Sequence, residues 1–386
     1  MKKILYLHTG AELYGADIVL LTLLKGLDKT KYEPFVVLPS DGPLVTELEA
    51  NNIEVHIIEY PILRRQYFTP KGLIYYAGSY FGSCKQILKL VKSRGINIIH
   101  VNTIAVLEGI YVAKKLNVPL VWHVHEILEK PKIVYKFTSA LMGRFATKIV
   151  TVSNAVKQHL LKSGFVKEAK IDVIYNGVDT EKFNPEIDSS NLRKELNIPV
   201  KAFIIGMIGR VNAIKGQDEF VKIVSMLARK YDPVYGVIVG DAFPGQEWRV
   251  DKLKEIIVNS GQKEKIKYLG YRSDANVLHN LFDVYMLPSV SADSLPTVVL
   301  EAMASRKVVA GYKNGGICEM VSDRKSGFLE PIGESTELAN DIEKLIIDDN
   351  LYRSMAQKGY ERNKMYFSLN AFYKKFDELY ESLDAI

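Results

Sequence analysis

The chain alternates short apolar runs, rich in β-branched residues, with longer segments of helical periodicity. This alternation is typical of βαβ units, in which each strand of a parallel sheet is followed by a covering helix. The runs of the first half are KILYLH, PFVVLP, VHII, INIIHVN, PLVWHVH, KIVTVS and IDVIYN. They are nearly continuous in apolar residues, as strands buried on both faces are. The first half is therefore predicted to form a doubly wound parallel sheet.

A second series of runs follows a polar, turn-rich stretch that begins after Asn176. These runs are FIIGMIG, YGVIVG, IKYLG, VYMLP and KVVAG. Because one hydrophobic core rarely serves a chain of 386 residues, two sheets in tandem are more economical than one. We predict an α/β protein with two doubly wound, Rossmann-like domains facing a central cleft, residues 1–180 and 181–364. A closing helix within 365–386 is expected to pack back on the first domain.

The composition indicates a folded protein without a membrane-spanning helix. Apolar residues make up 47% and charged residues 25%, an ordinary globular balance. The first apolar stretch, Ile4–Leu7, is too short for a signal peptide, and no run of 18 apolar residues follows. A cytoplasmic location is therefore expected.

The formal charge of +6 is concentrated in the first half, where residues 1–180 carry 23 Lys and Arg against 15 Asp and Glu. The stretch from Tyr60 to Gly95 has no acid and interleaves aromatic residues with cations, among them Arg64, Arg65, Lys89 and Lys92. Such a surface suits an anionic membrane. The alternative is a solvated basic helix whose aromatic residues lie in the core. No nucleic-acid module accompanies the charge, so nucleic acid is not an expected partner.

The stretch SADSLPTVVLEAMAS follows an apolar run and reads as a loop that leads into a helix. Pro296 suits a first helical turn, and the amides of Thr297 and Val298 then form an anion site. Asp293 in the loop and Glu301 on the helix are placed to grip hydroxyl groups on either side of a bound phosphate. Alternatively, Asp293 is a loop or capping residue and Glu301 a surface residue.

Two further loops carry residues suited to phosphate. In IIGMIGRVNAIKG, a strand runs into Gly209, and Arg210 and Lys215 are cations that could neutralise a diphosphate. They could equally be ordinary cations of a solvated loop, because neither dinucleotide nor Walker spacing is present. In HTGAELYGAD, Gly15 permits a tight backbone path into a helix.

The strand end VWHVHE places His123 and His125 on one face. No third ligand with recognisable spacing follows, so no metal site is predicted. His125, at the carboxyl end of the strand, is a candidate for contact with substrate. The alternative is a hydrogen-bonded structural histidine.

These elements together resemble the family 4 retaining glycosyltransferases, which have the GT-B fold. The resemblance covers essentially the whole chain and is most specific in IGRVNAIKG and DSLPTVVLEAMAS. VIYNGVD looks like the interdomain signature of the family, and LYGADIVLLTLLKGL like the helix entry of its acceptor domain. Asp293 stands where the family usually has glutamate, which shortens the arm by one methylene and leaves the donor sugar open.

The resemblance implies a donor site in the second domain and a substrate contact in the first. The donor-binding residues would be Gly15, Gly209, Arg210, Lys215, Asp293, Thr297, Val298 and Glu301. His125, Arg210, Lys215 and Asp293 would serve catalysis, with Glu301 on the ribose. Arg64, Arg65, Lys89 and Lys92 would face the acceptor and the membrane.

The expected function is therefore retaining transfer of a hexose or related sugar. The donor would be a nucleotide-diphosphate sugar, with a UDP-sugar favoured, and the acceptor a hydroxyl of a glycan or lipid-linked saccharide in cell-surface polysaccharide biosynthesis. No cofactor and no metal are expected, since no DxD motif stands in a suitable loop. The enzyme would be peripheral at the inner face of the plasma membrane. A nucleotide-sugar epimerase of the same fold, or a nonenzymatic nucleotide- or membrane-binding protein, are the alternatives.

Overall fold

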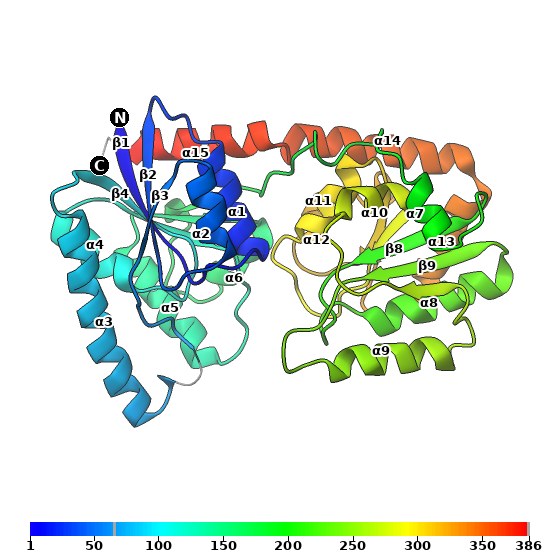
Figure 1. Ribbon diagram of the computed structural model, residues 1–386, viewed down its shortest axis with the longest axis horizontal. Helices are drawn as coiled ribbons and strands as arrows, with labels where there is room; N and C mark the ends of the chain where they lie inside the picture. Colours follow the sequence, from blue (N-terminus) through cyan, green and yellow to red (C-terminus); the bar gives the residue numbers. More distant parts are fainter. Residues whose placement is uncertain (65–66, 384–386) are drawn as a thin grey trace. The chain divides into compact units, whose positions relative to one another are not determined.

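The computed structural model describes residues 1–64 and 67–383, and the chain divides into two compact units (Figure 1). The first unit consists of residues 1–176 together with the C-terminal part from Phe372, and the second of residues 177–371. The sequence predicts the ends of the two domains at residues 180 and 364.

The first unit is built on a seven-stranded parallel sheet with the order β3-β2-β1-β4-β5-β6-β7. Its strands are β1 (Lys2–Leu7), β2 (Tyr32–Leu38), β3 (Glu54–Ile57), β4 (Ile96–Val101), β5 (Leu120–Val124), β6 (Lys148–Thr151) and β7 (Ile171–Val173). The connecting helices are α1 (Gly15–Lys25), α2 (Pro43–Ala50), α3 (Pro70–Val91), α4 (Glu108–Leu116), α5 (Lys132–Phe145) and α6 (Asn154–Leu161). After β1 the chain builds outward to β3 and then returns to place β4 on the other side of β1. The winding direction therefore reverses between β1 and β4, which is where ligands bind in open sheets of this kind.

The second unit is built on a six-stranded parallel sheet with the order β10-β9-β8-β11-β12-β13. Its strands are β8 (Phe203–Ile208), β9 (Val234–Val239), β10 (Ile266–Tyr268), β11 (Val284–Leu287), β12 (Val308–Tyr312) and β13 (Gly327–Glu330). Its helices are α7 (Ser190–Glu195), α8 (Gln217–Lys230), α9 (Trp248–Asn259), α10 (Ala275–Leu281), α11 (Thr297–Ala304), α12 (Ile317–Met320), α13 (Ser335–Ile347) and α14 (Asp349–Tyr366). Here the winding direction reverses between β8 and β11.

The last helix, α15 (Leu369–Ser382), brings the C-terminal part of the chain to the first unit. Phe372, Phe376 and Tyr380 are buried in the same core cluster as Leu20 and Leu23 of α1. The Tyr380 hydroxyl lies 3.0 Å from the Tyr6 hydroxyl and 2.7 Å from His100 Nδ1. Strand β1, near the N-terminus, thus packs against residues of α15, near the C-terminus.

The prediction of two doubly wound α/β sheets is confirmed, and every apolar run named above forms a strand. The strand that the sequence missed is β13, because GFLE is short and ends in a charged residue. Within residues 1–64 and 67–383, no helix is both long and apolar enough to cross a membrane.

Candidate active site

The loops that follow β8 and β11 meet at the switch point of the second sheet. The loop after β8 runs from Gly209 to Gly216, and the loop after β11 runs from Pro288 to Pro296. The Val290 amide donates to the carbonyl of Ile214 at 2.8 Å, so the two loops are joined directly. Because both strands are parallel, their carboxyl ends lie at one edge and their loops share a crevice.

Lys215 and Asp293 are brought together in this crevice. Lys215 Nζ lies 2.9 Å from Asp293 Oδ2, and the Ser289 hydroxyl donates to the same oxygen at 3.0 Å. The two charged side chains are 18% and 22% exposed, so the pair is largely shielded from water but still reachable. A diphosphate entering the crevice would offer Lys215 a second anionic partner.

Glycines allow the loops to approach this closely. Gly216 has φ +77°, and a Cβ atom there would overlap the carbonyl oxygen of Pro288. Likewise, a Cβ atom on Gly316, in the loop after β12, would overlap the carbonyl oxygen of Ser294. The Gly316 amide donates to the Asp293 carbonyl at 2.8 Å. These contacts fix the backbone on both sides of Asp293.

Glu301 lies deeper in α11 and is paired with a histidine of α10. Its Oε2 atom is 3.2 Å from His279 Nε2, and His279 is fully buried. Tyr285 of β11 donates its hydroxyl to the Ile208 carbonyl at 2.9 Å. Burial, followed by the charges of Glu301 and Asp293, raises the pKa of the Tyr285 phenol well above its ordinary value. Both carboxylates therefore raise the pKa of the same buried phenol, Tyr285, whose hydroxyl lies at the end of β8.

Helix α11 begins at Thr297, where the run TVVLEAMAS predicts it to begin. Pro296 is its N-cap residue, with ψ 108°, and Thr297 is the first helical residue. The position expected for Pro296, inside the first turn, is therefore wrong. The change leaves the anion site in place, since the Thr297 and Val298 amides belong to the first turn and have no carbonyl within the helix to bind.

Arg210 is held differently from Lys215. Its guanidinium carbon lies 3.4 Å from the centre of the Phe243 ring, in the loop after β9. The Arg210 carbonyl accepts a hydrogen bond of 2.9 Å from the buried side chain of Gln217. Gly209 stands beside the stem of Lys215, since a Cβ atom there would lie 4.0 Å from Lys215 Cδ.

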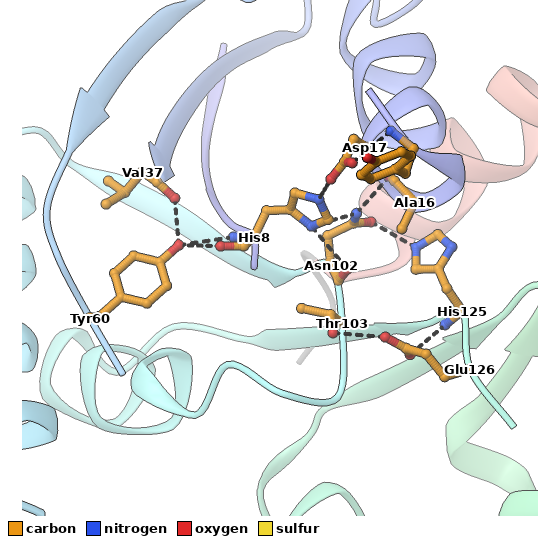
Figure 2. Close-up of polar contacts among 10 residues, drawn as sticks. His8, Ala16, Asp17, Val37, Tyr60, Asn102, Thr103, His125 and Glu126 are labelled. Carbon is orange, nitrogen blue, oxygen red and sulfur yellow. Dashed lines mark hydrogen bonds and ion pairs between the residues drawn. The ribbon is translucent and has the colours of Figure 1, made fainter. Parts of the chain in front are cut away.

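A second polar cluster lies at the switch point of the first sheet (Figure 2). His8, Asn102 and His125 are the residues that directly follow β1, β4 and β5, three neighbouring strands. Figure 2 shows the Asn102 side chain between the two imidazoles. Asn102 Oδ1 is 3.0 Å from His125 Nε2, and Asn102 Nδ2 is 3.2 Å from His8 Nδ1.

Asp17 and Glu126 extend this cluster. His8 Nε2 pairs with Asp17 Oδ1 of α1, and Asp17 Oδ2 accepts the Tyr14 amide at 2.8 Å. Glu126 accepts from the His125 amide at 3.1 Å. Burial lowers the pKa of His125 to about 3, so its imidazole is neutral near pH 7.

The other predicted residues have simpler surroundings. Gly15 is the first residue of α1, its φ is not positive, and a Cβ atom there would meet open space. Arg64, Lys89 and Lys92 are exposed, and Arg65 lies outside the described residues. Among residues 1–64 and 67–383, no group of three or more His, Cys, Asp or Glu side chains could hold a metal ion.

Sequence reasoning missed several residues of both clusters. Asn102 is 94 residues from His8, and only the neighbouring position of β1 and β4 brings it to His8 and Asp17. The available signal was a polar residue directly after a buried strand, in LYLH and IIHVN. For Gly216, Gly315 and Gly316, the only signal in the sequence was a glycine in the loop that follows a predicted strand.

Family models match both units of the chain. Residues 14–182 match the model described as Glycosyltransferase Family 4. Residues 188–362 match the model described as Glycosyl transferases group 1.

Two curated bacterial relatives align with nearly the full chain. One is UDP-Gal:alpha-D-GlcNAc-diphosphoundecaprenol alpha-1,3-galactosyltransferase of Escherichia coli, 26% identical and covering 94% of each chain. Another is N,N'-diacetylbacillosaminyl-diphospho-undecaprenol alpha-1,3-N-acetylgalactosaminyltransferase of Campylobacter jejuni, 26% identical over 97% of this chain and 96% of its own.

Solved structures of Anabaena Alr3699/HepE have the same fold. The complex with UDP is 26% identical with a TM-score of 0.86, covering 99% of this chain and 100% of its own. The complex with UDP-glucose has a TM-score of 0.84 at the same identity and coverage.

Proposed function

Since this chain belongs to the family 4 glycosyltransferases of the GT-B fold, we propose that it transfers a hexose or related sugar from a UDP-sugar to a lipid-linked saccharide with retention of anomeric configuration. By their names, two relatives transfer sugars to diphosphoundecaprenol-linked saccharides, and a third serves capsular polysaccharide biosynthesis. The epimerase and nonenzymatic alternatives find no support, because the relatives with assigned activities are transferases.

The observation that carries the proposal is the shielded Lys215–Asp293 pair beside the first turn of α11. A diphosphate placed there would meet the ammonium group of Lys215 and the free amides of Thr297 and Val298, which together neutralise its charge. Arg210 would add a second cation once its guanidinium turns toward the phosphates. Glu301, held by His279, would accept hydrogen bonds from the ribose hydroxyls. The UDP complexes of a structural neighbour support this donor class.

The proposed reaction exchanges one bond at the anomeric carbon for another on the same face of the sugar. The bond between the anomeric carbon and the diphosphate oxygen breaks, and its electron pair leaves with the diphosphate. The acceptor oxygen forms the new bond, and its proton passes to the departing phosphate. Lys215, Arg210 and the helix amides stabilise the charge that develops on the leaving group, so no metal is required. Asp293 and His125 orient the sugar.

Product analysis tests the reaction directly. The purified protein is incubated with UDP-, GDP- and ADP-hexoses and a synthetic diphospholipid-linked saccharide, in the presence of EDTA. We expect release of one nucleotide diphosphate, UDP, only when the acceptor is present, and a product whose anomeric proton has the coupling constant of the donor configuration. An inverted product would refute retention. Interconversion of a UDP-sugar without acceptor would refute transfer.

Exposed side chains of α3 support an anionic membrane surface as a further partner. Leu73, Ile74, Tyr75 and Phe81 are 53%, 76%, 62% and 54% exposed, so these side chains do not lie in the core. The helix carries lysines and no acid. Exposed apolar side chains can enter the headgroup region while the lysines bind anionic lipids.

Vesicle binding checks this surface. Reversing Lys89 and Lys92 to glutamate is expected to weaken binding to phosphatidylglycerol vesicles by at least about tenfold, since each well-placed cation contributes about 1 kcal/mol. Ile74→Asp should weaken it further. Lys325→Glu, which reverses an exposed charge of the second unit, is the matched control and should change little. Undiminished binding by the Lys89 and Lys92 variant would rule out this surface.

A further inference from the structure

The hydrogen-bond pattern of the cluster in Figure 2 determines which ring nitrogens carry hydrogen. The side-chain amide of Asn102 contacts three groups. Its Nδ2 atom lies 3.3 Å from the carbonyl oxygen of Ala16 and 3.2 Å from His8 Nδ1, while its Oδ1 atom faces His125. A backbone carbonyl can only accept, so the amide nitrogen must be the atom that faces Ala16. This fixes the orientation of the whole amide.

The tautomer of His8 follows from the two groups that flank it. The Asp17 carboxylate can only accept, so His8 Nε2 carries a hydrogen and donates it to Asp17, and in the neutral ring His8 Nδ1 is the acceptor that faces Asn102 Nδ2 at 3.2 Å. The backbone oxygen of Asn102 also lies 3.3 Å from His8 Nδ1, but two acceptors cannot bond, so this is a nonbonded contact.

The tautomer of His125 follows from the other end of the same amide. Asn102 Oδ1 accepts, so His125 Nε2 carries the hydrogen of the 3.0 Å contact. A neutral imidazole has one hydrogen, which leaves Nδ1 of His125 as an acceptor. His8 and Asn102 are fully buried and Asp17 is nearly so, whereas His125 is only partly buried. Of the four side chains, His125 is thus the one that a substrate can reach.

We propose that Asp17, His8 and Asn102 are positioning residues that hold His125 in the Nε2–H tautomer and so present His125 Nδ1 as a hydrogen-bond acceptor for a hydroxyl group of the sugar substrate. This inference rests on the proposed function. It adds a specificity to that function: the group bound at His125 must be a donor, so a sugar that lacks the hydroxyl, or carries a methyl ether there, is a poor substrate. The Ala16 carbonyl at one end and the Asn102 amide beside it fix the hydrogen on His125 Nε2, and Asp17 fixes the hydrogen on His8 Nε2.

Nitrogen-15 correlation spectra of the full-length protein without substrate test the tautomers first. Two-bond couplings distinguish a protonated Nε2 from a protonated Nδ1, and His125→Gln and His8→Gln assign the signals. We expect the Nε2–H form for both residues. An Nδ1–H form of His125 in the wild type would overturn the proposal, and this readout does not depend on any catalytic activity.

Substitutions at Asn102 then connect the tautomer with turnover. Asn102→Leu removes the acceptor for His125 and should produce a mixture of His125 tautomers with kcat/KM lowered about 10- to 100-fold, which is the loss expected for one hydrogen bond to a buried group. Asn102→Asp keeps an acceptor for His125 Nε2, so it should retain the Nε2–H form and recover part of the activity. In a His125→Phe background, Asn102→Leu should cost little more, because its effect passes through His125.

The outcomes separate the inference from the proposed function. If no nucleotide sugar is turned over but the tautomers are as expected, the function is wrong and the hydrogen-bond chain stands. Full activity of Asn102→Leu, or losses that add fully in the double variant, would show that Asn102 only supports the fold.

Discussion

Replacing Lys215 with methionine is expected to lower kcat for sugar transfer by about 10²–10³-fold, the effect of removing one preorganised group that stabilises developing negative charge. Methionine keeps the length of the stem but removes the ammonium group that lies 2.9 Å from Asp293. The leaving diphosphate then loses a cation, and the Asp293 carboxylate, left with Ser289 as its partner here, repels the incoming phosphate. Steady-state kinetics with the donor that gives the highest turnover measure the change.

A matched variant separates this effect from the general loss of a Lys–acid pair. Lys230 Nζ pairs with Glu343 at 2.6 Å, and Lys230 is well exposed, away from the loops that carry the site. Lys230→Met should therefore leave kcat within about twofold of the wild type, because exposed pairs contribute little. If both methionine variants keep normal turnover, Lys215 does not contact the leaving group and the donor site is misplaced.

Acidification from pH 7.5 to 5.5 is expected to destabilise the first unit, because three buried imidazoles contribute about 4 kcal/mol in that direction and the carboxyl of Glu108, whose pKa burial raises to about 7, offsets only part of it. Burial lowers the pKa of His100 and of His125 to about 3 and the pKa of His123 well below its ordinary value. In the unfolded chain the same imidazoles bind protons near pH 6.5, so below that pH the unfolded state holds more protons than the folded state. The stability that these residues contribute is thus present above about pH 6.5 and decreases continuously as the pH falls toward 3.

Tryptophan fluorescence makes the measurement specific to this unit. Trp122 is fully buried in β5, whereas Trp248 of the second unit is 55% exposed and should respond weakly to unfolding. Urea unfolding followed at each pH gives the free energy of the first unit.

His123→Leu is the informative variant for the same experiment. Both ring nitrogens of His123 are buried, and neither has a hydrogen-bond partner among the described residues. Leucine should remove about a third of the pH dependence that the imidazoles contribute, at no cost near pH 7.5, since an unpaired polar group is replaced by an apolar one. An unchanged pH dependence would mean that His123 is not kept neutral by the fold.

The fold was readable from the sequence because strands buried in parallel sheets are apolar without interruption. ILYL of β1 and VIV of β9 are surrounded by other elements on both faces, and so few residues of another kind are tolerated there. GFLE of β13 shows where this reasoning ends, since a four-residue strand needs no extended apolar run. Pro296 is the N-cap residue of α11 and does not lie in its first turn, which shows that the role of a residue at a helix end is set by local backbone geometry.

The candidate site was readable only where one loop carries several of its residues. Asp293, Thr297 and Glu301 share one strand–loop–helix unit, so their spacing could be interpreted directly. His8 and Asn102 are 94 residues apart, and their contact depends on which strands are neighbours in the sheet. His279, which pairs with Glu301, comes from a separate helix and gave no signal of its own.

The return of the chain through α15 makes the second unit an insertion within the first. Residues 177–371 begin and end inside a unit whose own two pieces are 1–176 and the C-terminal part from Phe372. Lys2 Nζ donates to the Tyr380 carbonyl at 2.7 Å, so the two pieces meet near the ends of the chain. A domain swap between relatives should therefore exchange residues 177–371 at two junctions, because a cut at one junction would separate the first unit from part of its own core.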